Sequence, residues 1–438
     1  MVSLTRSTEV ADDSGASRSV APWIPVAWVV LLFVSSFRFT GQRSVNAAVS
    51  GSASIENAIE LAVYAGIGFL AAVRLLWRTP RFAPFGVGAF FAFSLLSVAS
   101  VLWSVIPLFT LIRSMQLVAL AMLIAVTAGL WNEGVRQRDH DWTRVWLWYL
   151  GVAGVASIAA FLWPNWQKDR WSWPGLHTGT TAEYIAIAAM VLLSMWVEVG
   201  WRISPRFRRF VPFLFLVALT LLMLTITRSA LFGFVAGAFL IVWTGSRLRA
   251  DRRFAVVGGI LAVAVAGLAW FSEALVEYLL RGQTVDQFYT FTGRTDLWAF
   301  ALEQLNEAAL LGFGYGSARV ILIDEFFWAG TGHNLWIEAA LSVGIIGAVL
   351  LTVVLAWMVF KALKFQRTEP GPSSSMALGF AAATLVSGFA STALALPGLN
   401  FAAAGIMLAA LSSRQAARVP FADPGSDGGT LAVVGAGT

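Results

Sequence analysis

The chain contains a succession of apolar runs, most of them about the 20 residues that a helix needs to cross a bilayer. Hydrophobic residues make up 58% of the chain and charged residues 12%, with a mean hydropathy of +0.74, which excludes a soluble globular protein. We therefore expect an all-α polytopic membrane protein of about twelve transmembrane helices, near residues 22–38, 57–77, 84–103, 107–130, 145–163, 180–200, 210–226, 228–244, 254–271, 333–360, 376–394 and 398–413.

The distribution of basic residues predicts how these spans are oriented. If the amino terminus is cytoplasmic, 21 of the 30 Lys and Arg residues lie on the cytoplasmic side, as the positive-inside rule requires. Both termini are then cytoplasmic, and we expect a multi-pass protein of the cytoplasmic (inner) membrane. The net charge of +6 follows from these topological clusters, so it does not indicate a nucleic-acid partner.

The spans divide the chain into five parts. Residues 1–21 and 414–438 have the polar or glycine-rich composition of disordered cytoplasmic ends. Residues 22–271 carry spans one to nine, and residues 333–413 carry spans ten to twelve. The about sixty residues between them, 272–332, form an extracytoplasmic loop, and loops of that length are usually functional.

A helix is predicted inside this loop, over residues 295–309. Thr295 is a plausible cap, and Asp296 lies in the first turn, where a carboxylate favours the helix dipole. The apolar side chains recur at helical spacing, which predicts a helix lying on the membrane surface. This stripe consists of Trp298, Leu302, Leu305 and Ala309.

A glycine-rich segment, Gly312-Phe313-Gly314-Tyr315-Gly316, follows the predicted helix. Three glycines allow the backbone to turn sharply or to approach a ligand closely. We take Gly314 and Tyr315 as candidate substrate-binding residues. A plain turn is an equally good interpretation of the same residues.

Several basic residues depart from the orientation rule by facing outward. Arg228 lies between two apolar runs at the outer membrane face, and Arg294 immediately precedes the loop helix. Two planar guanidinium groups at one face could hold a diphosphate without a metal ion, although contact with lipid headgroups is the competing explanation. The outward set is Arg38, Arg43, Arg113, Lys168, Arg170, Arg228, Arg281, Arg294 and Arg319.

Two further arginines of this set are candidate substrate contacts, Arg113 and Arg319. Arg113 lies six residues into span four, about 9 Å from its outer end by helix rise. It either lines a cavity or extends its head to the membrane surface. No cysteine is present, and no metal-ligand motif is evident, so no metal site is predicted.

His333 lies at the outer entry to span ten, after a flexible Gly330-Thr331-Gly332 segment. An imidazole there could take a proton from a sugar hydroxyl, although a lone histidine is more often structural. Asn334 and Glu338, one turn apart, either contact substrate or orient the site and pair within the bundle. We expect His333 to share one outward-facing cavity, open sideways to lipid, with Arg228 and Arg294.

Other interpretations stay open at this point. The four tryptophans around Lys168 and Arg170 could stack on sugars, but anchoring at the membrane interface explains them better. A transporter would place charges at mid-membrane, whereas these charges gather outside. A passive scaffold would leave the outward arginines unexplained.

Taken together, these fragments resemble the O-antigen ligase superfamily, which also contains polysaccharide-repeat polymerases. The similar features are an Arg-Ser-Ala turn at 228–230, Gly-Arg-x-x-x-Trp at 293–298, Gly-x-Gly-x-Gly at 312–316, His-Asn-x-x-x-Glu at 333–338, Gly-x-x-Gly at 344–347, and an early Leu102-Trp103-Ser104 with Pro107 and Arg113. One departure is the segment 175–184, where Thr180-Thr181-Ala182-Glu183 replaces a family-like asparagine.

The resemblance implies a GT-C-like fold and metal-independent, inverting transfer of a glycan at the outer face of the cytoplasmic membrane. The donor would be an undecaprenyl-diphosphate-linked glycan, and the acceptor a hydroxyl of a glycan or glycolipid. Arg228 and Arg294 would hold the diphosphate leaving group, and His333 would activate the acceptor. No cofactor is implied, and membrane lipids are the other expected partners. Ligase and polymerase share these motifs, so the acceptor stays open.

Overall fold

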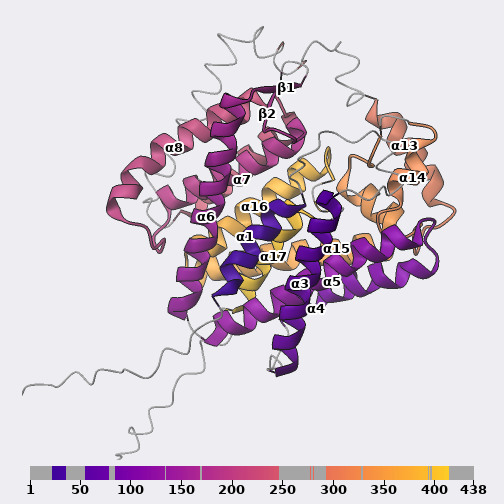
Figure 1. Cartoon of the computed structure of the whole chain (residues 1–438), viewed down its shortest axis with the longest axis horizontal. Coiled ribbons are helices and arrows are strands. Elements are labelled where there is room, and N and C mark those ends of the chain that lie inside the picture. Colours follow the sequence, from indigo (N-terminus) through magenta and orange to yellow (C-terminus); the bar gives the residue numbers. More distant parts are fainter. Residues whose placement is uncertain are drawn as a thin grey trace, which may run out of the picture.

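The computed structural model describes residues 22–35, 55–77, 84–133, 135–167, 170–245, 293–326, 329–392 and 397–413, with residues 277, 280 and 394 (Figure 1). The terminal segments 1–21 and 414–438, the ninth predicted span at 254–271 and residues 281–292 of the predicted loop lie outside the described residues. The boundaries predicted for these parts therefore stay predictions.

The described elements, in chain order, are α1 (Trp23–Val34), α3 (Ile55–Trp77), α4 (Phe85–Ala99), η1 (Ser100–Leu102), α5 (Pro107–Glu133), α6 (Val135–Leu162), β1 (Asn165–Gln167), β2 (Arg170–Ser172), α7 (Thr178–Val197), α8 (Pro205–Leu224), α9 (Arg228–Thr244), α13 (Arg294–Leu305), α14 (Ala318–Ile323), α15 (Leu335–Thr368), α16 (Pro372–Gly388) and α17 (Leu399–Ser413). The chain is thus mostly helical. The departure from an all-α fold within the described residues is the short antiparallel hairpin of β1 and β2, in which Trp166 pairs with Trp171.

Seven helices in the described part of the chain are long and apolar enough to cross a membrane: α3, α4 with η1, α5, α6, α7, α8 and α15. This makes the chain a polytopic membrane protein. Helices α1, α9 and α17 are apolar but shorter, with 12, 17 and 15 residues. The total of twelve spans therefore stays a prediction.

Helix α17 forms the centre of the bundle, and every residue of it except Asn400 is buried. Its alanines and glycine keep its surface narrow, so that neighbouring backbones can come close. A methyl group in place of the Gly405 hydrogen would lie 3.0 Å from the Trp28 ring of α1. Helices α1, α4, α5, α15 and α16 all pack against α17 (Figure 1).

Helix α15 is broken near its first third. Val343 and Gly344 have non-helical backbone angles, and Gly344 has a φ of 72°. The glycine-rich segment fills the break, because the Phe313 N–H donates to the Leu341 carbonyl at 2.8 Å and the Ile345 N–H donates to the Ala309 carbonyl at 2.9 Å. The backbone groups released by the break are therefore satisfied by the preceding loop.

Candidate functional site

Three helices meet at one end of the bundle, which we call the His333 end. Helix α9 runs antiparallel to α16: Gly233 lies against Ser387 near the end of α16, and Gly237 lies against Gly379 farther back. The start of α9 therefore lies beside the end of α16. The first residue of α15, Leu335, contacts Gly388 at the same place. Small residues permit this close approach, as in other membrane helix pairs.

Arg228 is the first residue of α9. The turn that leads into it contains Ile226 with a φ of 45°, which is unusual for a β-branched residue because its side chain crowds the backbone in this region. Strained residues of this kind persist where the surrounding structure holds them, often at functional sites. The turn fixes the point at which the Arg228 side chain leaves the backbone.

Arg294 is the first residue of α13, and its Nη1 donates to the Ala390 carbonyl at 2.8 Å, just beyond the end of α16. The helix begins after Gly293, whose φ of 78° suits glycine. The predicted cap Thr295 was therefore wrong: Thr295 lies inside the helix, although Asp296 occupies the first turn as expected. The helix also ends at Leu305 instead of residue 309.

His333 lies between α13 and the start of α15 and has a φ of 47°. The next residue, Asn334, caps α15: its Oδ1 accepts from the Trp336 N–H at 3.0 Å and the Ile337 N–H at 3.2 Å. The Asn334 amide nitrogen also donates to the Phe389 carbonyl at 3.4 Å. His333 is thus held beside the same end of α16 that Arg294 contacts.

Electrostatic effects link the three predicted catalytic residues. Burial lowers the pKa of the Arg294 guanidinium, and the positive charge of Arg228 lowers it further. Burial, the charge of Arg294 and that of His177 lower the pKa of His333 to about 4. The three residues therefore influence one another electrostatically. At neutral pH the His333 imidazole is uncharged and can accept a proton.

His177 is a further member of this group that sequence reasoning did not select. It caps α7, with Nδ1 accepting from the Gly179 N–H at 3.1 Å, so Nε2 carries the proton of the neutral ring. Burial and the positive charge of Arg170 lower the pKa of His177. The signal was present in the sequence, because a histidine followed by Thr178 and Gly179 directly precedes an apolar run.

The β1–β2 hairpin is fastened to the start of α7 beside His177. The Gln167 side chain donates to the Leu176 carbonyl at 2.7 Å, and the Trp173 N–H donates to the Thr181 hydroxyl at 3.1 Å. Trp166 stays 55% exposed on the hairpin, whereas Trp171 and Trp173 are buried. Of the four tryptophans in and around the hairpin, only Trp163 and Trp166 are exposed and available for contacts outside the bundle.

The remaining candidate residues lie farther into the protein. The Arg113 guanidinium forms an ion pair with Glu60 and a hydrogen bond with Gln116. It also lies over the Phe109 ring, and Arg319 lies over the same ring, at 5.3 and 5.5 Å from the centroid respectively. Arg113 therefore has a partner inside the bundle, instead of reaching the membrane surface.

Gly314 and Tyr315 are buried. A side chain at Gly314 would overlap Ser104, and the Tyr315 ring packs edge-on against Phe93. The Tyr315 N–H donates to the Ser100 hydroxyl at 2.9 Å. The glycine-rich segment thus approaches other parts of the protein closely, and a substrate contact by these residues stays a prediction.

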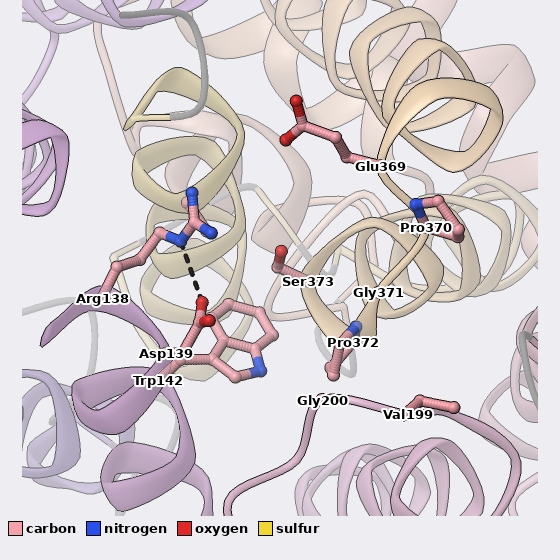
Figure 2. Close-up of a pocket in the computed structure, with 11 residues that line it drawn as sticks. Arg138, Asp139, Trp142, Val199, Gly200, Glu369, Pro370, Gly371, Pro372 and Ser373 are labelled. Carbon is pink, nitrogen blue, oxygen red and sulfur yellow. Dashed lines mark hydrogen bonds and ion pairs between the residues drawn. The ribbon is translucent and has the colours of Figure 1, made fainter. Parts of the chain in front are cut away.

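The larger of two described pockets lies away from these residues (Figure 2). It is lined by the ends of α6, α7, α15 and α16 that are opposite the His333 end, with Arg138 and Asp139 paired on one wall and Glu369 facing them. The second pocket is apolar and lies among α4, α15 and α17. The outward-facing cavity expected around His333 therefore stays a prediction. Among the described residues, no group of three His, Asp or Glu side chains could hold a metal ion.

The bundle of apolar helices makes this chain a polytopic membrane protein, with arginine and histidine residues gathered at one end. Residues 213–352 match the family model for O-antigen ligase. This stretch runs from α8 into α15 and contains every candidate site residue from Arg228 to Glu338, and Arg113 alone lies outside it. The resemblance predicted from the sequence motifs is confirmed: this part of the chain is similar to the O-antigen ligase family.

Two characterised relatives are similar to this chain. An O-antigen ligase from Pseudomonas aeruginosa is 27% identical over 372 residues, which cover 83% of this chain and 82% of the relative. The exopolysaccharide production protein ExoQ from Rhizobium meliloti is 31% identical over 140 residues, or 30% of this chain and 32% of the relative. Both names concern surface polysaccharides.

Proposed function

We propose that this protein transfers a glycan from an undecaprenyl-diphosphate carrier to an acceptor hydroxyl, without a metal ion and with inversion at the anomeric carbon. The observation that carries the proposal is the gathering of Arg228, Arg294 and His333 around the end of α16, within the stretch that matches the O-antigen ligase family. The His333 end then faces the outer side of the cytoplasmic membrane, and both termini are cytoplasmic, as the basic clusters indicate.

The two arginines would stabilise the leaving group. The acceptor oxygen bonds to the anomeric carbon on the face opposite the diphosphate while the bond from that carbon to the diphosphate oxygen breaks. The bonding electron pair leaves with the diphosphate, whose added negative charge the Arg228 and Arg294 guanidinium groups offset. Their mutual repulsion in the free protein is relieved when this anion lies between them.

His333 would accept the hydroxyl proton as the new bond forms. In the free protein its imidazole is neutral, because its pKa is about 4. A bound diphosphate neutralises part of the charge of Arg294, which is one cause of that low pKa, so donor binding raises the pKa of His333. The base therefore becomes stronger when the donor is in place.

The acceptor would approach from the side of His177 and the β1–β2 hairpin. Arg294 and, in its protonated form, His177 both lower the pKa of His333, and Arg170 lowers that of His177 in turn. If the diphosphate lies on the side of Arg228 and Arg294, the side of His177 is left for the acceptor. An imidazole N–H and an exposed Trp166 ring suit a sugar, whose hydroxyl groups accept hydrogen bonds and whose C–H face stacks on aromatic rings.

Transfer to a finished acceptor and repeated transfer to a growing polymer are both compatible with this site. The Pseudomonas relative is named as a ligase, while ExoQ is named for exopolysaccharide production. A ligase gives one product whose length equals that of the donor glycan plus the acceptor. A polymerase gives a ladder of products that differ by one repeat.

The test is transfer by the purified protein in lipid nanodiscs, with a polyprenyl-diphosphate-linked glycan, candidate acceptors and a chelator. We expect wild type to consume the donor and His333→Ala to be slower by at least about a hundredfold. The matched control is His140→Ala, since the His140 side chain is 46% exposed and lies on α6 at the opposite end of the bundle.

The outcomes separate the parts of the proposal. Equal rates for wild type and His333→Ala would show that another residue is the base. Activity that disappears in chelator and returns with a divalent cation would contradict metal independence. In a parallel reconstitution into sealed vesicles, uptake of a glycan without transfer would show a transporter.

A further inference from the structure

Gly332, the residue immediately before His333, is held at both of its backbone polar groups. The Gly332 N–H donates to Glu338 Oε2 at 2.6 Å, and the Gly332 carbonyl accepts from Trp298 Nε1 at 3.0 Å. Gly332 is buried, and a methyl group in place of its hydrogen would lie 3.2 Å from the same Glu338 oxygen. The backbone ahead of His333 thus has little freedom to rotate.

The residue after His333 is fastened as well. Asn334 caps α15 with its side-chain oxygen and donates from its amide nitrogen to the Phe389 carbonyl. His333 lies between these two anchored neighbours in a left-handed conformation that L residues rarely adopt. The contacts on both sides over-determine its backbone and fix the direction in which its side chain leaves the chain.

One helix contributes both to this arrangement and to the proposed leaving-group site. Arg294 and Trp298 are four residues apart on α13, so they share one face of the helix. The guanidinium donates to the Ala390 carbonyl and the indole donates to the Gly332 carbonyl. On another face of α13, Leu297 and Ala301 are fully buried in a cluster with Leu341 of α15.

We propose that Trp298 is a positioning residue, which holds His333 at a fixed place relative to Arg294 through the Gly332 carbonyl. This inference rests on the proposed function, because it assigns His333 and Arg294 to one reaction. In this role Trp298 acts through the backbone of Gly332 and not by contact with donor or acceptor. The hydrogen bond from its indole N–H links α13 to the residue that precedes His333.

The test replaces Trp298 by phenylalanine, which keeps an aromatic ring but has no N–H group. Loss of one hydrogen bond that orients the base predicts a kcat about fivefold to tenfold lower, with the KM for the donor within about twofold of wild type. Arg294→Gln should instead both lower kcat and raise the KM for the donor, because the guanidinium group is proposed to contact the diphosphate. The control is Trp148→Phe on α6, where the side chain is 44% exposed and distant in sequence from the site.

A second measurement does not depend on transfer activity. The chain has three histidines, His140, His177 and His333, so selective 13C labelling of the imidazole carbons gives three signals that single substitutions assign. We expect Trp298→Phe to shift and broaden the His333 signal and to change its titration midpoint, while the His140 signal stays unchanged. Trp148→Phe should leave all three signals in place.

The two measurements separate the proposals. A kcat and a His333 signal that both stay at wild-type values in Trp298→Phe would overturn the positioning role. A fall in activity that is matched by a lower melting temperature, with the His333 signal of the folded protein unmoved, would assign Trp298 to stability alone and also overturn it. If wild type transfers no glycan, the proposed function fails, and the histidine signals still decide whether Trp298 holds His333.

Discussion

Arg294 and Trp298 lie one turn apart on α13 and donate hydrogen bonds to carbonyl groups of two segments far apart in sequence, at Ala390 and at Gly332. The loop helix therefore connects the end of α16 to the start of α15. A rigid helix is a precise way to set the distance between two groups, because its turns are regular and its own hydrogen bonds resist bending.

The pH dependence of transfer should reflect His333. Since the pKa of His333 is about 4, kcat/KM for the donor should be flat from pH 8 to about pH 5 and fall as the pH drops through about 4. In Arg294→Gln one cause of the low pKa is removed, so the pKa of His333 rises and the acid limb moves to higher pH. Steady-state rates between about pH 3 and about pH 8 measure this. An acid limb that stays in place or moves to lower pH would contradict the assignment of the base.

Replacement of His177 should affect the acceptor more than the donor. His177→Asn keeps a side-chain oxygen that can cap α7 but removes the imidazole N–H. We expect the KM for the acceptor to rise about threefold to tenfold, with the KM for the donor unchanged. Initial rates with each substrate varied in turn measure the two constants. A rise in the KM for the donor alone would show that His177 acts on the donor, and it would contradict this assignment.

Arg113 should prove to be a structural residue. Its guanidinium pairs with Glu60, whose side chain is 2% exposed, so Arg113→Gln leaves a buried carboxylate without its cation. We expect a loss of about 3 to 5 kcal/mol of stability, and partial recovery in the double variant with Glu60→Gln. Chemical denaturation in detergent gives the stabilities. If the folded double variant binds the donor much more weakly than wild type, Arg113 contacts substrate after all.

Gly344 should not accept a side chain. Its φ is 72°, and a Cβ there would overlap the Leu310 carbonyl in the break of α15. Gly344→Ala should lower the free energy of unfolding by at least about 2 kcal/mol, because the glycine-rich segment must move away from the helix. The control is Gly151→Ala on α6, where a Cβ meets open space and should be tolerated within about 1 kcal/mol. Similar melting curves for the two variants would contradict this view of the break.

Much of the helical structure could be predicted from apolar runs, because a backbone inside a membrane must satisfy its own hydrogen bonds. The resemblance of the motifs to the O-antigen ligase family was also predictable and is confirmed. Arg228, Arg294 and His333 were selected for their chemistry, and the helix packing and hydrogen bonds place each of them by the end of α16. Their roles in transfer stay predictions.

Partners that are distant in sequence could not be predicted. Two examples are the Glu60 carboxylate, which pairs with Arg113, and the Gly332 carbonyl, which accepts from Trp298. Both contacts depend on how the helices pack, and the local spacing of residues does not predict that packing. The same reason explains the missed β1–β2 hairpin, whose short strands are stabilised by contacts with α7. Thr295 was chosen as a cap by residue type, whereas the left-handed Gly293 begins the helix.

The helix at the centre of the bundle is also the last one that the structure describes along the chain. Membrane helices are inserted in the order in which they are synthesised, so α1, α4 and α5 must wait beside lipid until α17 emerges from the ribosome and fills the space between them. The helical bundle is therefore completed only late in the synthesis of the chain. A premature stop codon just ahead of α17 would leave the site residues encoded but would deprive the earlier helices of the partner that holds them together.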